Sequence, residues 1–84
     1  MEDPFFRRFC CTNEFGFERV IDSHFPDFAA ERLAERYCEQ MAEYPEEQEV
    51  VVRDTSTAEV IVYTVYIEAV PQFRAERNPD AKIS

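Results

Sequence analysis

A row of glutamates is the feature of this sequence best suited to chemistry with a partner. It comprises Glu31, Glu35, Glu39 and Glu43, four residues apart, and continues beyond Pro45 with Glu46, Glu47 and Glu49. Residues four apart share one face of a helix, about 6 Å apart along its axis. Such a row predicts contact with a surface rich in Lys and Arg, such as a channel for a phosphate backbone. The alternative is a solvated helix face that only keeps the chain soluble.

The charge balance limits the choice of partner. The chain has 84 residues, a formal net charge of −9, and 18 acids against nine bases. Residues 27 to 68 contain 11 of the acids and three arginines, hence −8. This field repels nucleic acids and anionic membranes and attracts basic proteins. We therefore expect a basic protein surface as partner and no direct binding of nucleic acid.

Catalytic and metal-binding patterns are hard to find. His24 is the single histidine, and it follows Asp22 and Ser23 directly. Adjacent side chains in an extended segment diverge, so these three do not predict a triad. One glycine cannot make a phosphate-binding loop, and the acids lack the loop spacing of a calcium site. We expect no enzyme activity, no metal and no cofactor.

The three cysteines, Cys10, Cys11 and Cys38, cannot all pair within one chain. In a strand, the neighbours Cys10 and Cys11 point to opposite faces. Free and partly buried thiols are the expectation.

The elements that would hold these residues begin with a hairpin of strands over 5–12 and 15–21. A helix over 26–43 follows, because Pro26 suits a first helical position and Pro45 ends the pattern. Its apolar stripe comprises Ala30, Leu33, Ala34, Tyr37, Cys38, Met41 and Tyr44.

Strands over 49–54 and 59–69 form a second hairpin, because their residues are mostly β-branched or aromatic. A short edge strand over 73–76 and a frayed tail over 77–84 complete the chain. The fold class is α+β: one domain with an antiparallel β-β-α-β-β sheet and one helix across one face.

A single helix covers only one of two apolar faces in the long strand. One face comprises Val60, Val62, Thr64 and Tyr66, and the other comprises Ile61, Tyr63, Val65 and Ile67. We assign the second set to an oligomer or partner face. The N-terminal aromatics Phe5, Phe6 and Phe9, folding back over the sheet, are the alternative occupant.

The longest uncharged run, Val60 to Ile67, is too short to span a bilayer. The acidic start Met1 to Pro4 lacks the basic residues of a secretory signal, so we expect a cytoplasmic protein.

The stretch from Pro26 to Arg77 resembles small phage and prophage accessory proteins. The residues that carry the resemblance are Ala29–Arg32, Tyr44–Asp54 and Glu68–Ala75. Small acidic phage proteins include anti-CRISPR inhibitors and other DNA mimics. The resemblance implies a fold and a phage or prophage setting, and it agrees with the charge of the chain. From the glutamate row and the −8 segment we expect an inhibitor that binds a basic surface of a nucleic-acid-binding defence complex. The alternative is an accessory module that dimerises or binds a partner through its apolar sheet face.

Overall fold

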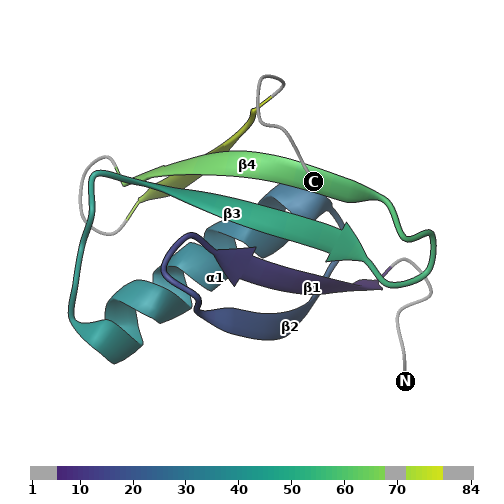
Figure 1. The fold of residues 1–84 in the computed structure, drawn as a ribbon, viewed down its shortest axis with the longest axis horizontal. Helices are drawn as coiled ribbons and strands as arrows, with labels where there is room; N and C mark the ends of the chain where they lie inside the picture. Colours follow the sequence, from purple (N-terminus) through teal and green to yellow (C-terminus); the bar gives the residue numbers. More distant parts are fainter. Residues whose placement is uncertain (1–5, 68–71, 79–84) are drawn as a thin grey trace.

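The computed structural model describes residues 6–67 and 72–78. One antiparallel sheet carries one helix, which confirms the predicted α+β class (Figure 1). The elements in chain order are β1 (Arg7–Asn13), β2 (Glu18–Ser23), α1 (Pro26–Met41), β3 (Glu47–Asp54), β4 (Val60–Ile67) and β5 (Phe73–Arg77). The strands lie in the order β2-β1-β3-β4-β5. Both predicted hairpins form, and β1 joins them by pairing with β3 across the helical crossover.

The first hairpin turns where the strand pattern is interrupted in the sequence. Asn13 Oδ1 accepts hydrogen bonds from the backbone N–H groups of Phe15 (3.0 Å) and Phe17 (2.9 Å). Gly16 has φ +84°, a conformation that glycine adopts without steric cost. The turn therefore occupies residues 14–17, and β2 starts three residues later than predicted.

The helix begins at Pro26 as predicted but ends at Met41, two residues early. Ala42 takes the left-handed conformation, with φ 54°, which turns the chain away before Pro45 is reached. As a result, the predicted apolar stripe is wrong at its C-terminal end. Met41 and Tyr44 are exposed, whereas Leu33, Tyr37 and Cys38 are buried.

The second hairpin agrees with the expected strands, apart from their ends. β3 begins at Glu47, two residues early, and pairs with β4 from Glu47–Tyr66 to Arg53–Val60. β5 extends to Arg77, so this residue belongs to the edge strand and not to a tail. The predicted residues 68 and 69 of the long strand, and 79–84 of the tail, lie outside the described residues.

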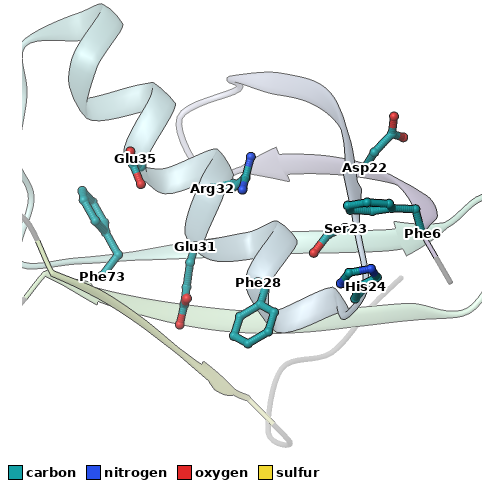
Figure 2. A pocket seen from close by; sticks show the side chains of 9 residues that line it. All are labelled: Phe6, Asp22, Ser23, His24, Phe28, Glu31, Arg32, Glu35 and Phe73. Carbon is teal, nitrogen blue, oxygen red and sulfur yellow. The ribbon is translucent and has the colours of Figure 1, made fainter. Parts of the chain in front are cut away.

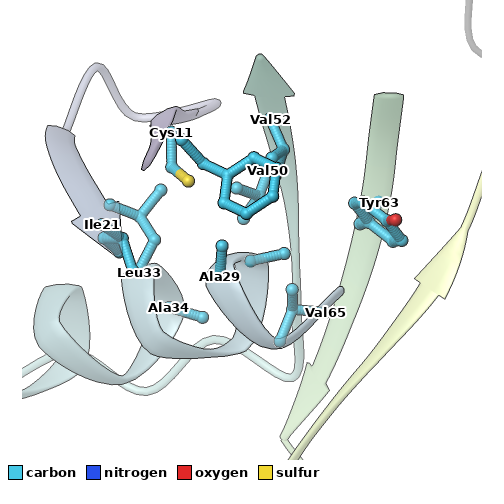
Figure 3. Packing of buried hydrophobic residues seen from close by; sticks show 11 residues of the cluster. Cys11, Ile21, Ala29, Leu33, Ala34, Val50, Val52, Tyr63 and Val65 are labelled. Carbon is cyan, nitrogen blue, oxygen red and sulfur yellow. The ribbon is translucent and has the colours of Figure 1, made fainter. Parts of the chain in front are cut away.

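The core lies between α1 and one face of the sheet, and the helix contacts all five strands (Figure 3). It comprises Phe9, Cys11, Ile21, Ala29, Ala30, Leu33, Ala34, Val50, Val52, Tyr63 and Val65. The three helix alanines let the helix approach the strands closely. Each large buried side chain contributes about 1.5–3 kcal/mol relative to its exposed state.

Candidate functional site

The helix and the following strand divide the predicted glutamates among different surfaces. Only Glu31, Glu35 and Glu39 lie on α1, because Glu43 follows the end of the helix. Glu46 precedes β3, whereas Glu47 and Glu49 belong to it. The predicted helical row of four is therefore wrong at Glu43, and three glutamates share α1.

Glu31 is partly buried and its carboxylate has a structural contact. Its Oε2 accepts a hydrogen bond from the backbone N–H of Ala75, at 2.9 Å. Ala75 lies in β5, an edge strand of the sheet. Edge strands leave backbone groups unpaired, so this carboxylate satisfies one of them. Glu31 thus ties the edge of the sheet to the helix.

Glu43 also makes an internal contact. The hydroxyl group of Tyr37 donates a hydrogen bond of 2.8 Å to Glu43 Oε2. This hydrogen bond, together with burial, raises the pKa of Tyr37 above its ordinary value of 10.0. The contact holds Glu43 at the C-terminal end of α1.

Strand alternation directs Glu47 and Glu49 away from the helix. Gln48 lies between these two glutamates and Val50 follows Glu49, and both are fully buried beneath α1. Side chains alternate between the faces of a strand, so the two exposed glutamates lie on the opposite face. That face, which no helix covers among the described residues, is called the open face below.

The first hairpin adds a carboxylate that the sequence did not reveal. The backbone N–H of Glu49 donates to Glu14 Oε1 (3.2 Å), and the N–H of Glu14 donates to the Glu49 carbonyl (3.0 Å). The pairing of β1 with β3 creates this contact between residues far apart in the chain. No sequence signal could identify Glu14, because the contact depends on strand register.

These residues lie along one edge of the molecule, with Glu39 and Glu43 on the helix side of the sheet and Glu47 and Glu49 on the open face. The end of α1, the β1–β2 turn and the start of β3 follow one another along the left side of Figure 1. We call this surface the acidic end and define it by Glu14, Glu39, Glu43, Glu46, Glu47 and Glu49. Among the described residues, no ion pair within 4 Å neutralises any of them, because the pairs observed join Arg7–Asp54, Arg8–Asp22 and Arg74–Glu76.

Nearby arginines have other contacts. Arg19 hydrogen-bonds Gln40 Oε1 at 3.0 Å and its guanidinium lies 4.2 Å from the centre of the Phe17 ring. Arg32 and Arg36, on the same helix as Glu35 and Glu39, form no ion pair with them in the described part of the chain.

The acidic end also opposes the helix dipole. The last turn of α1 has no basic residue, yet Glu39 lies in it and Glu43 follows it. A helix C-terminus carries partial negative charge, which disfavours neighbouring carboxylates by about 0.3–1 kcal/mol each. The dipole therefore disfavours the charge of both glutamates, and for Glu43 the hydrogen bond from Tyr37 offsets this effect.

The assignment of an oligomer face to Ile61, Tyr63, Val65 and Ile67 is corrected by the structure. Tyr63 and Val65 belong to the core beneath α1, and Ile61 packs against that core. Ile67 shares their side of β4 by alternation and is partly buried. Phe9 is also in this core, and Phe6 stacks on His24 at 4.2 Å; Phe5 lies outside the described residues. The face that the helix leaves uncovered is the open face, which carries Val60, Thr64, Tyr66 and the buried Val62.

The residues considered for catalysis each contact a different partner. Asp22 pairs with Arg8 at 3.1 Å, and Ser23 Oγ accepts a hydrogen bond from the Phe25 N–H at 3.4 Å. His24 stacks against Phe6. No group of three or more His, Cys, Asp or Glu among the described residues has a metal-binding arrangement.

The cysteines are free, and the neighbours face opposite sides as predicted. Cys11 is fully buried beneath α1, whereas Cys10 lies on the open face and is partly exposed. Burial, followed by the charge of Cys10, raises the pKa of Cys11 to about 12. Burial also raises the pKa of Cys38, against a lowering effect of the Gln48 amide.

None of the helices in the described residues is long and apolar enough to cross a bilayer. No protein-family model, curated protein or solved structure matches the chain in the three comparisons made.

Proposed function

We propose that this chain is a stoichiometric inhibitor that binds a basic surface of a nucleic-acid-binding defence complex. The acidic end provides the contact, and the bound protein blocks access of nucleic acid to that surface. The chain acts by occupancy and needs no catalytic group, metal or cofactor. The observation that carries the proposal is the gathering of six carboxylates at one end without neutralising ion pairs among the described residues.

The position of these charges supports a binding role over a stabilising one. Like charges repel one another, and the helix C-terminus adds a further unfavourable interaction for Glu39 and Glu43. Glu14 and Glu43 each accept a hydrogen bond within the fold, whereas the other four carboxylates have no described hydrogen bond or ion pair and are available for association. A concentrated negative surface steers a basic partner and raises the association rate, more so at low salt.

The proposal is tested with purified CRISPR effector complexes and labelled target DNA. Wild-type protein should reduce DNA binding by at least one complex, with a potency that falls as salt rises. The double variant Glu39→Lys and Glu47→Lys should weaken inhibition at least about tenfold, since close interfacial charge pairs are each worth about 1.5 kcal/mol or more. Neither side chain makes a described hydrogen bond, so the fold should be kept.

The matched control is the double variant Glu59→Lys and Glu76→Lys, which changes the net charge equally outside the acidic end. Its potency should stay within about twofold of the wild type, as expected for peripheral charges. An equal loss of inhibition in both double variants would show that overall charge, and not the acidic end, determines inhibition. A wild type that leaves DNA binding unchanged in every complex would refute the proposal.

A second candidate is self-association through the open face. Val20 is 54% exposed there, and Val51, Val60 and Tyr66 are only partly buried. Apolar side chains across neighbouring strands are typical of a protein interface. Sedimentation equilibrium over a concentration series should then show a dimer that Val20→Lys dissociates and Val20→Thr retains. A monomeric wild type throughout the series would rule out the dimer.

A further inference from the structure

A groove of about 640 Å³ lies along α1 from Phe28 to Glu35 and extends to His24 and Phe73 (Figure 2). It is lined by Phe6, Asp22, Ser23, His24, Phe28, Glu31, Arg32, Glu35 and Phe73. The lining thus combines aromatic rings with three carboxylates and one arginine. With His24 neutral, these side chains carry a formal charge of −2.

Aromatic side chains in and beside the groove are exposed but held in place. Phe6 and Phe28 are 50% and 49% exposed. Phe6 stacks on His24, while Phe25 contacts Phe28 edge to face with ring centres 5.5 Å apart. Rings that are already ordered lose little conformational freedom when a ligand packs on them. Several half-exposed rings around one groove indicate a binding surface.

One carboxylate of the groove, that of Glu31, is also held in position. Phe28, Glu31 and Glu35 follow one another at spacings of three and four, so they line one side of α1. Figure 2 shows Phe28 and Glu31 projecting from the same side of the helix, with Arg32 directed away from them. The hydrogen bond from the Ala75 N–H fixes Glu31 Oε2. Phe73, from β5, lines the same groove.

We infer that this groove binds an arginine side chain presented by an extended, basic segment of a partner protein. A guanidinium group is planar and weakly hydrated, so it stacks on an aromatic face while its N–H groups point to carboxylates. Phe28 supplies such a ring, and Glu31 and Glu35 supply the carboxylates on the same side of the helix. The negative lining favours a cation over a neutral or acidic segment.

Arginine suits this groove better than lysine. Its five N–H donors form a fork that can reach two carboxylates while the plane stays on a ring. The lysine ammonium is compact and strongly hydrated, so it gains less from the rings. The inference concerns a different surface from the acidic end and does not require that surface to bind.

The test uses blocked pentapeptides of glycine and serine with a central arginine, lysine or citrulline. Citrulline has nearly the shape of arginine but no charge. Titration of the ¹⁵N-labelled full chain should show saturable shifts at the amides of the first half of α1 and of β5 with the arginine peptide. Lysine should bind several-fold more weakly, and citrulline should not saturate.

Variants then distinguish binding in the groove from general attraction to the negative charge of the protein. Phe28→Ala and Glu35→Gln should each weaken binding of the arginine peptide by about two- to fivefold, the range expected for loss of one cation–π or exposed ionic contact. Phe15→Ala and Glu39→Gln remove an equally exposed ring and an exposed helix glutamate outside the groove, and should leave affinity unchanged.

Three results would overturn the inference. They are equal binding of the citrulline peptide, equal loss in the two control variants, and arginine-induced shifts confined to the acidic end. The last result would refute arginine binding in the groove but would leave the inhibitor proposal intact. If instead the protein binds the arginine peptide in the groove but leaves DNA binding unchanged in every complex, the groove inference stands and the inhibitor proposal is refuted.

Discussion

Glu31 is one of the predicted recognition glutamates, yet the structure gives it a contact inside the fold. Its Oε2 lies 2.9 Å from the backbone nitrogen of Ala75 on the edge strand β5. Glu31→Ala removes this acceptor, and the amide of Ala75 then has only water as a partner. The change should loosen β5 while the four remaining strands keep their pairing.

The magnitude follows from the type of hydrogen bond. A hydrogen bond to a charged group contributes about 1.5–3 kcal/mol when buried. Glu31 is only partly buried, so solvent screening reduces this to about 1–2 kcal/mol. That free energy corresponds to a factor of about 5–30 in the local opening equilibrium, because 1.4 kcal/mol is a factor of ten. Glu31→Gln keeps a neutral acceptor and should lose about half as much free energy.

Hydrogen exchange at single amides measures this directly, because local opening controls exchange of a protected amide. Protection of the Ala75 amide should fall about 5- to 30-fold in Glu31→Ala and less in Glu31→Gln. Glu35→Ala, one turn away and without a described hydrogen bond, is the control and should leave Ala75 unchanged. Unchanged protection of Ala75 in Glu31→Ala would refute a structural role for this carboxylate.

Three further predictions concern the core and the thiols. Leu33→Ala, at a position with no exposure, should lower the free energy of unfolding in urea by about 2–5 kcal/mol; a loss below about 1 kcal/mol would contradict the packing. Because burial holds the pKa of Cys11 at about 12 against an ordinary value of 9.0, the folded chain keeps a proton that the unfolded chain loses. Stability should therefore fall from pH 9 towards pH 12 by about 1.4 kcal/mol per unit, and Cys11→Ala should flatten this slope in alkaline denaturation curves. A thiol reagent at neutral pH should label Cys10 rapidly in the folded protein and Cys11 and Cys38 only after unfolding, measured by mass spectrometry; equal rates would contradict the burial.

Local chemistry accounts for the elements that were predicted well. Pro26 begins the helix as expected, because its missing N–H and fixed φ suit the first helical position. The run of valines at Val50 to Val52 became a central strand, where β-branched side chains pack on a pleated surface. The C-terminal end of the helix was predicted less accurately. The prediction relied on Pro45, but the helix ends at Met41 because Ala42 takes a left-handed conformation.

The candidate surfaces depended on contacts that no local pattern contains. Alternation in β4 was predictable, but which of its two sets of side chains would meet the helix was not. The pairing of β1 with β3, and of β5 with β4, decided how the sheet is built beneath α1. The same pairing placed Glu14 beside Glu49 and gave Glu31 its partner in Ala75.

From the residue pattern alone we could predict the composition of the surface, the order of strands and helix along the chain, and which residues share one side of each element. These properties follow from charge and from the periods of 3.6 and two residues in helices and strands. The folded arrangement was needed to show which glutamates remain exposed, which act within the fold, and which apolar face is covered. Strand register and the line of the helix across the sheet bring together residues distant in the chain, and the free energy of burying one common core selects that arrangement.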